Sequence, residues 1–193
     1  MNKKLTEIIF LLDRSGSMGG LESDTIGGFN AFIDRQCKEG ETRLTTVLFD
    51  DEMEVLWDGI DARHARLTQE EYYVRGCTAL LDAVGKTISA AGRRLSQTKE
   101  GERPGKVIVV ITTDGMENAS REYTYEKVKK MISHQQEKYS WDFIFIGANM
   151  DASEEAQSLG IHKEDSFSFE ATHEGVGKMY DMVCDAVTDR RID

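Results

Sequence analysis

Asp13-Arg14-Ser15-Gly16-Ser17 follows directly on the apolar run Ile8-Ile9-Phe10-Leu11-Leu12, and this stretch decides the expected fold. A short run of β-branched and large apolar residues is typical of a buried strand. The residues after it place one carboxylate and two hydroxyls at alternate positions, where the strand would leave its sheet. In open α/β sheets, ligands bind at this end of the strands. A set of oxygen donors without His or Cys favours a hard cation such as Mg²⁺ or Mn²⁺.

Strand-like and helix-like apolar patterns alternate along the rest of the chain. Further strands are expected at 44–49, 53–57, 106–112, 141–146 and 167–169, and helices at 21–37, 78–95, 123–138, 152–159 and 172–187. Only a short polar turn, 50–52, separates the second and third strands, so these two should form an antiparallel hairpin. The pattern predicts an α/β fold: a central, mostly parallel six-stranded sheet with one antiparallel edge strand and helices on both faces.

Composition limits the classes of partner. The chain has 193 residues, which fits one domain over 1–193, and its net charge of −11 disfavours nucleic acid and anionic membrane surfaces as partners. No apolar stretch approaches the length of a membrane span, and no signal sequence is recognisable. Cys37, Cys77 and Cys184 form neither a disulfide framework nor a zinc pattern, so we expect a cytoplasmic protein in which most of these cysteines are buried free thiols.

Three loops should meet at the carboxyl ends of the parallel strands. The first is 13–17, the second is 76–83 and opens a helix, and the third is 112–118 and leaves the most apolar strand. Parallel crossovers are right-handed, so these loops share one rim of the sheet. Together they supply two carboxylates, Asp13 and Asp114, and three hydroxyls, Ser15, Ser17 and Thr78.

These five residues, in this order, resemble the signature of von Willebrand factor A-type domains that carry a metal-ion-dependent adhesion site. That signature is Asp-x-Ser-x-Ser, then a distant Thr, then a distant Asp. The resemblance covers essentially the whole chain. The flanking words 13–18 and 113–115 are similar to those of small bacterial members, including members associated with tellurite resistance. Cys77 is a departure, because a second Gly before the Thr is common in the family.

The resemblance implies a Rossmann-like fold and a role for each residue. Ser15 and Ser17 would bind Mg²⁺ or Mn²⁺ through their hydroxyls, and Thr78 would bind directly or through water. Asp13 and Asp114 would act largely through water. Neutral hydroxyl ligands leave the cation electron-poor and one coordination position open, which an Asp or Glu of a partner protein can fill.

The leading hypothesis is therefore a metal-dependent protein-interaction module without catalytic residues, which could also work within a larger protein complex. The alternative is a metal-assisted hydrolase or phosphotransferase that uses the same site, with Asp13 as a phosphate-accepting nucleophile. Against it, Ser15 stands where a second acid would be expected, and no Lys or His can be assigned as an acid or base. Nucleotide binding ranks lower, because the glycine-rich stretch 16–20 fits neither a dinucleotide fingerprint nor a P-loop.

Other polar residues near these loops have simpler interpretations. We expect the cluster Asp50-Asp51-Glu52 to be a solvated turn rather than a second metal site. Asp82 is interpreted as part of a solvated helix face, although it could hydrogen-bond to a loop. Glu117 and Asn118 could shape the rim, but they are as well explained as caps of the following turn.

Overall fold

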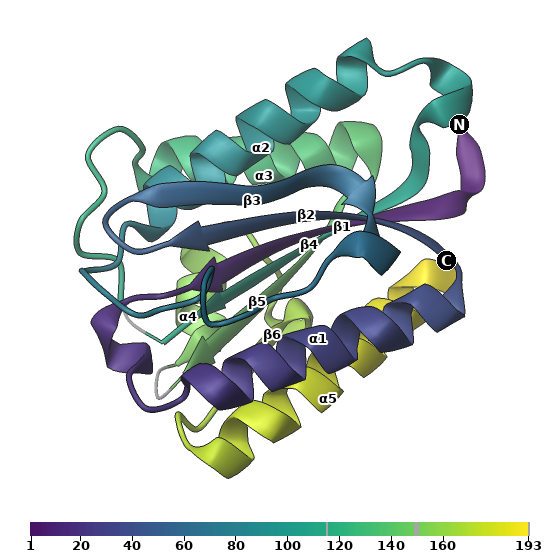
Figure 1. The fold of residues 1–193 in the computed structure, drawn as a ribbon. Helices are drawn as coiled ribbons and strands as arrows, with labels where there is room; N and C mark the ends of the chain where they lie inside the picture. Colours follow the sequence, from purple (N-terminus) through teal and green to yellow (C-terminus); the bar gives the residue numbers. More distant parts are fainter. Residues whose placement is uncertain (115, 149–150, 193) are drawn as a thin grey trace.

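The computed structural model describes residues 1–114, 116–148 and 151–192 and contains one six-stranded sheet (Figure 1). The strands are β1 (Asn2–Asp13), β2 (Glu41–Phe49), β3 (Met53–Asp61), β4 (Pro104–Thr113), β5 (Asp142–Ala148) and β6 (Ser166–Phe169). The α-helices are α1 (Glu22–Glu39), α2 (Leu80–Gln97), α3 (Tyr125–Tyr139), α4 (Ala152–Ser158) and α5 (His173–Ile192). Short 3-10 turns are η1 (Gly16–Met18), η2 (Ala62–His64), η3 (Glu100–Glu102) and η4 (Lys163–Asp165).

The strand order is β3-β2-β1-β4-β5-β6, which confirms the predicted fold class. The pair β2–β3 is antiparallel, and each of the other pairs is parallel. β1 and β4 therefore lie at the centre, with both neighbours in place and both faces covered. Their continuous apolar sequences follow from this position, because a parallel strand buried on both faces has no polar side.

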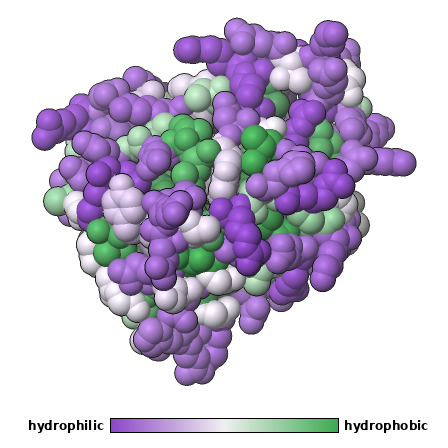
Figure 2. All heavy atoms as spheres, viewed as in Figure 1, coloured by the Kyte–Doolittle hydropathy of each residue, from purple (hydrophilic) through white to green (hydrophobic). Residues whose placement is uncertain are grey.

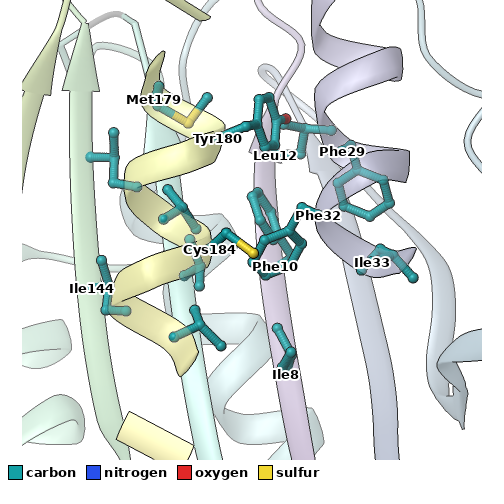
Figure 3. Close-up of a cluster of buried hydrophobic side chains, with 14 of the residues drawn as sticks. Ile8, Phe10, Leu12, Phe29, Phe32, Ile33, Ile144, Met179, Tyr180 and Cys184 are labelled. Atoms are coloured by element: carbon teal, nitrogen blue, oxygen red, sulfur yellow. The ribbon is translucent and has the colours of Figure 1, made fainter. Parts of the chain in front are cut away.

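Helices cover the two faces of the sheet (Figure 1). On one face, α1 and α5 lie side by side over Ile8, Phe10 and Leu12 of β1. Figure 3 shows Phe10 between the Phe29–Phe32 side of α1 and Cys184 of α5. On the other face, α2, α3 and α4 pack on the alternate side chains of the same strands, among them Ile9 and Leu11. The alternation of side chains along β1 thus divides the core into two layers.

Strand bounds differ from the sequence-based expectation mainly at polar ends. β1 begins at Asn2, before the apolar run, because Leu5 pairs with Glu41 and Asn2 pairs with Pro104. β3 runs on to Asp61, past a register shift in its pairing with β2. Backbone pairing with neighbouring strands extends both elements through residues whose side chains give no strand signal.

The surface is mostly hydrophilic. Figure 2 shows charged and polar side chains over most of one face, with apolar residues gathered in small patches between them. Across the described residues, no helix combines the length and apolar character needed to cross a membrane.

Candidate metal site

Asp13 ends β1 and is buried, with 1% of its surface exposed. Its Oδ1 accepts a hydrogen bond from the Ser15 N–H at 2.6 Å. Its Oδ2 accepts bonds from the Thr113 hydroxyl at 2.7 Å and from the Asp114 N–H at 3.3 Å. Burial raises the pKa of Asp13 to about 6; hydrogen bonds from Ser15 oppose the shift, and the nearby Asp114 carboxylate adds to it. One carboxylate thus joins the ends of β1 and β4, in surroundings that a cation would stabilise.

Ser15 and Ser17 extend this cluster toward solvent. The Ser15 hydroxyl donates to Asp114 Oδ1 at 3.1 Å and lies 3.3 Å from the Ser17 hydroxyl. The turn η1 produces this arrangement, because the Met18 N–H bonds back to the Ser15 carbonyl at 3.0 Å and curls the chain. Ser15 is buried, whereas Ser17 is exposed. The hydroxyls therefore lead from the buried Asp13 carboxylate to the surface.

Thr78 lies on the loop before α2 and is held between the other two loops. Its N–H donates to the Asn118 side-chain oxygen at 2.9 Å, and its carbonyl accepts from the Asn118 N–H at 3.0 Å. On the other side, the Gly16 N–H donates to the Gly76 carbonyl at 3.2 Å. Among the described residues, no hydrogen bond joins the Thr78 hydroxyl to the two serines or the two aspartates. Four of the five predicted residues are thus in direct contact, and the fifth lies on a bonded neighbouring loop.

The turn 117–120 is anchored to the start of α2. Glu117 accepts a bond from the Leu81 N–H at 3.2 Å, so together with Asn118 it fixes the Thr78 loop. Glu117 also caps its own turn, because its carboxylate accepts hydrogen bonds from the N–H groups of Ala119 and Ser120. Asn118 lies within the same turn. Capping and shaping of the rim, which the sequence left as alternatives, therefore occur together at these positions.

The interpretation of Asp82 as a solvated residue is wrong. Its carboxylate accepts three backbone hydrogen bonds, from the N–H groups of Arg121, Glu122 and Tyr123, at 2.9 to 3.0 Å. Burial alone would raise the pKa of Asp82, but these three donors outweigh it and lower the pKa below the usual value. Asp82 therefore closes the loop that leads from the site to α3.

Asp50 also departs from the expectation of a solvated turn. Asp51 and Glu52 are exposed as expected, but Asp50 is fully buried. Its carboxylate binds Arg14, which is 1% exposed and lies between two of the predicted site residues. Sequence reasoning missed this pair, because the partners are 36 positions apart and no spacing rule links them. The one available signal was an Arg inside an otherwise acidic and hydroxyl-rich stretch.

The donor set fits a hard divalent cation. It comprises two carboxylates and the hydroxyls of two serines, with a third hydroxyl on the adjacent loop. Within the described part of the chain, no group of three or more His, Cys, Asp or Glu side chains is placed to hold a metal ion. Mg²⁺ suits a donor set of carboxylates and hydroxyls, because it is bound through few carboxylates and keeps several waters.

Comparison with known proteins agrees with this fold. A sequence profile described as von Willebrand factor type A domain matches residues 7–181. No curated protein sequence matches the chain significantly.

Several solved structures share the fold. Proximal thread matrix protein 1 from the mussel byssus, with a zinc-occupied MIDAS motif, is 16% identical with a TM-score of 0.64; the match covers 97% of this chain and 47% of that one. The vWF domain of the type V pili tip protein Mfa5 from Porphyromonas gingivalis is 10% identical with a TM-score of 0.69, covering 94% of each chain. The pilus adhesin SpaC from Lactobacillus rhamnosus GG is 11% identical with a TM-score of 0.70, covering 97% of this chain and 30% of that one. The chain spans about half the length of the byssus protein, and at these identities the likeness establishes the fold alone.

Proposed function

Because the chain belongs to the von Willebrand factor type A domain family, we propose that it is a divalent-metal-dependent protein-interaction module and not an enzyme. In this proposal Asp13, Ser15, Ser17, Thr78 and Asp114 hold Mg²⁺ or Mn²⁺ at the carboxyl rim of the sheet. The two serines bind the ion directly, Thr78 binds it directly or through water, and the aspartates act largely through water. The zinc-occupied motif of the mussel byssus protein supports a divalent ion at such a site.

The observation that carries the proposal is the contact of the Ser15 hydroxyl with both Asp114 and Ser17. It brings the first and third parts of the motif, 99 positions apart, into one cluster that opens to solvent at Ser17. An ion held mostly by neutral hydroxyls keeps much of its positive charge. It would therefore attract a carboxylate from outside the chain as its last ligand.

The partner in this proposal is a protein that supplies an Asp or Glu to the ion. A net charge of −11 makes nucleic acid and anionic membranes poor alternatives. Pilus proteins among the structural neighbours support an interaction role, and membership of a multi-protein complex is consistent with it. We propose that residues 1–193 act as one domain in the cytoplasm, where the unpaired Cys37, Cys77 and Cys184 would stay reduced. The expectation that most of these thiols are buried is wrong, because Cys184 is buried but Cys37 is half-buried and Cys77 is exposed.

Calorimetric titration of metal-stripped protein tests the site. We expect saturable binding of Mg²⁺ or Mn²⁺ by the wild type, and loss of that binding in Asp13→Ala and in Ser15→Ala/Ser17→Ala. Ser23→Ala, which removes an exposed hydroxyl from α1, is the matched control and should bind metal like the wild type. Absence of binding in the wild type, or equal binding in all four proteins, would contradict the proposal.

Affinity capture tests the interaction role. Immobilised protein should retain its partner with Mg²⁺ present and release it on chelation, and the double serine variant should not retain it. Capture that survives chelation would contradict a metal-dependent contact. Turnover of generic phosphate esters by the wild type, lost in Ser17→Ala, would instead favour the enzymatic alternative.

A further inference from the structure

Asp50 is the only residue of the acidic turn 50–52 that is buried, and both its side chain and its backbone bind other loops. Its Oδ2 accepts hydrogen bonds from Arg14 Nε at 3.2 Å and from Arg75 Nε at 2.7 Å. Its carbonyl oxygen accepts from the Ala79 N–H at 2.8 Å. Asp50 therefore binds the chain on both sides of Thr78, at Arg75 before it and at Ala79 after it.

Arg14 connects this anchor to the serine loop. It lies between Asp13 and Ser15, and its backbone N–H donates to the Phe49 carbonyl at 2.8 Å. Its own carbonyl accepts from the Arg75 N–H at 2.9 Å, so the serine loop and the Thr78 loop are bonded along their backbones. Adjacent side chains of an extended segment point to opposite sides, so Arg14 meets the β2–β3 hairpin while Asp13 turns toward Asp114.

Each arginine of this cluster pairs with a second carboxylate besides Asp50. Arg14 Nη1 binds Glu54 at 2.7 Å, and Arg75 Nη2 binds Glu52 at 2.9 Å. Both guanidiniums lie over the ring of Tyr73, and the Cζ atoms of Arg14 and Arg75 are 5.7 and 5.9 Å from its centroid. A buried arginine and a buried aspartate are costly to desolvate, and one carboxylate oxygen shared by two guanidiniums holds its partners in one arrangement.

We infer that Arg14 and Asp50 are positioning residues that set the distance between the Thr78 loop and the Ser15–Ser17 hydroxyls. The inference rests on the proposed metal site. Mg²⁺ needs near-octahedral ligands at about 2.1 Å, whereas Ca²⁺ accepts more variable geometry at about 2.3–2.6 Å. A rigid Thr78 loop therefore favours the smaller ion, and a loosened loop loses that preference.

The test compares Mg²⁺ and Ca²⁺ dissociation constants of wild type, Asp50→Asn and Arg14→Lys. We expect Asp50→Asn to weaken Mg²⁺ binding about 10- to 100-fold, the range for residues that orient metal ligands, and to weaken Ca²⁺ binding less. Arg14→Lys keeps the charge but loses the guanidinium that joins Asp50 to Glu54. Its Mg²⁺ affinity should therefore lie between those of the wild type and Asp50→Asn. A change of charge alone would weaken both ions equally, so the ratio of the two constants reports on position.

Glu7→Gln is the matched control. Glu7 is also a fully buried acid of the sheet, and it pairs with Arg94 of α2, away from the three loops. Glu7→Gln should lower the stability of the fold without changing the ratio of the Mg²⁺ and Ca²⁺ dissociation constants. If Asp50→Asn fails to fold, Arg75→Gln is the second variant, because the Arg75 side chain is 43% exposed and forms one of the two ion pairs of Asp50. It should shift the ratio of the Mg²⁺ and Ca²⁺ dissociation constants in the same direction but by less.

Hydrogen exchange of the metal-free proteins separates the possible failures. If Asp50 holds the loop, the Ala79 and Arg75 amides should exchange faster in Asp50→Asn but not in Glu7→Gln. The inference would be overturned if the wild type binds metal but Asp50→Asn changes neither the ratio of the Mg²⁺ and Ca²⁺ dissociation constants nor the exchange of the two amides. That result would leave the proposed function intact. A wild type that binds no metal would overturn the proposed function, whatever the exchange shows of the loop.

Discussion

Asp82 illustrates how a single side chain can close a loop that the sequence does not connect to it. Its three backbone donors belong to a segment about 40 positions later in the chain. An aspartate at the start of a helix is commonly explained by the helix dipole or by solvation, and both explanations need only local sequence. The partners of Asp82 are set by the path of another loop, so the residue type alone could not reveal them.

The Asp82 contacts predict a pH-dependent loss of stability in Asp82→Asn. The amide can accept on one oxygen only and turns a donor toward another donor, so we expect a cost of about 1–3 kcal/mol at pH 7. The folded-state pKa of Asp82 is lowered, so its stabilisation is complete above the unfolded value of 3.8 and is lost as the pH falls through the folded value. Urea unfolding measured at pH 7 and at pH 3 should therefore give a smaller difference in the free energy of unfolding between wild type and variant at pH 3.

Asp34→Asn provides the comparison for that experiment. Asp34 is an exposed acid on α1, so its replacement should change the free energy of unfolding by less than about 0.5 kcal/mol at either pH. An equal cost of Asp82→Asn at both pH values would mean that the charge of Asp82 does not contribute.

At the scale of elements, α1 and α5 pack closely because α1 has a glycine at the contact. A Cβ built at Gly28 would lie 2.3 Å from Tyr180 Cδ2, whereas a Cβ at Gly27 meets nothing within 4 Å. Tyr180 is buried and stacks on Phe10 at 6.2 Å, so its ring cannot easily move aside. Packing therefore requires a glycine at position 28 but not at position 27.

The contrast predicts opposite effects of two otherwise identical substitutions. Gly28→Ala should destabilise the protein by about 1–3 kcal/mol through overpacking against Tyr180. Gly27→Ala should stabilise it by about 0.5–1 kcal/mol, since Ala is the better helix former and the site is open. Chemical denaturation of both variants measures the difference. Similar values for the two would show that α5 shifts to accept the new methyl group.

Elements were easier to predict than the contacts between them. The apolar runs 8–12 and 107–111 predicted the two central strands, because a strand covered on both faces must be apolar throughout. The motif likewise predicted that Asp13, Ser15, Ser17 and Asp114 would meet, since parallel strands carry their following loops to one rim. The buried Arg14–Asp50 pair could not be predicted, because it depends on how three loops fold over one another.

At the scale of the whole molecule, the excess of negative charge affects how any metal effect must be measured. The chain carries 35 acidic and 24 basic side chains, so added salt of any kind reduces repulsion within the folded state. Two carboxylates share the candidate site, where burial, with a smaller contribution from the Asp114 carboxylate, raises the pKa of Asp13 to about 6. A divalent ion can therefore stabilise the protein in two ways, by screening everywhere and by binding at one place.

Thermal unfolding at constant ionic strength separates these contributions. Replacing KCl by MgCl₂ should raise the free energy of unfolding by about 2.7 kcal/mol at one hundred times the dissociation constant, because the ion binds only the folded chain. For a chain of this size that corresponds to about 5–10 °C in the unfolding midpoint. Ser15→Ala/Ser17→Ala keeps the overall charge and the screening but loses the binding hydroxyls, so its midpoint should stay unchanged. An equal rise in both proteins would assign the whole effect to divalent ions bound elsewhere on the acidic surface, because binding at the serine loop is the one contribution that the substitution removes.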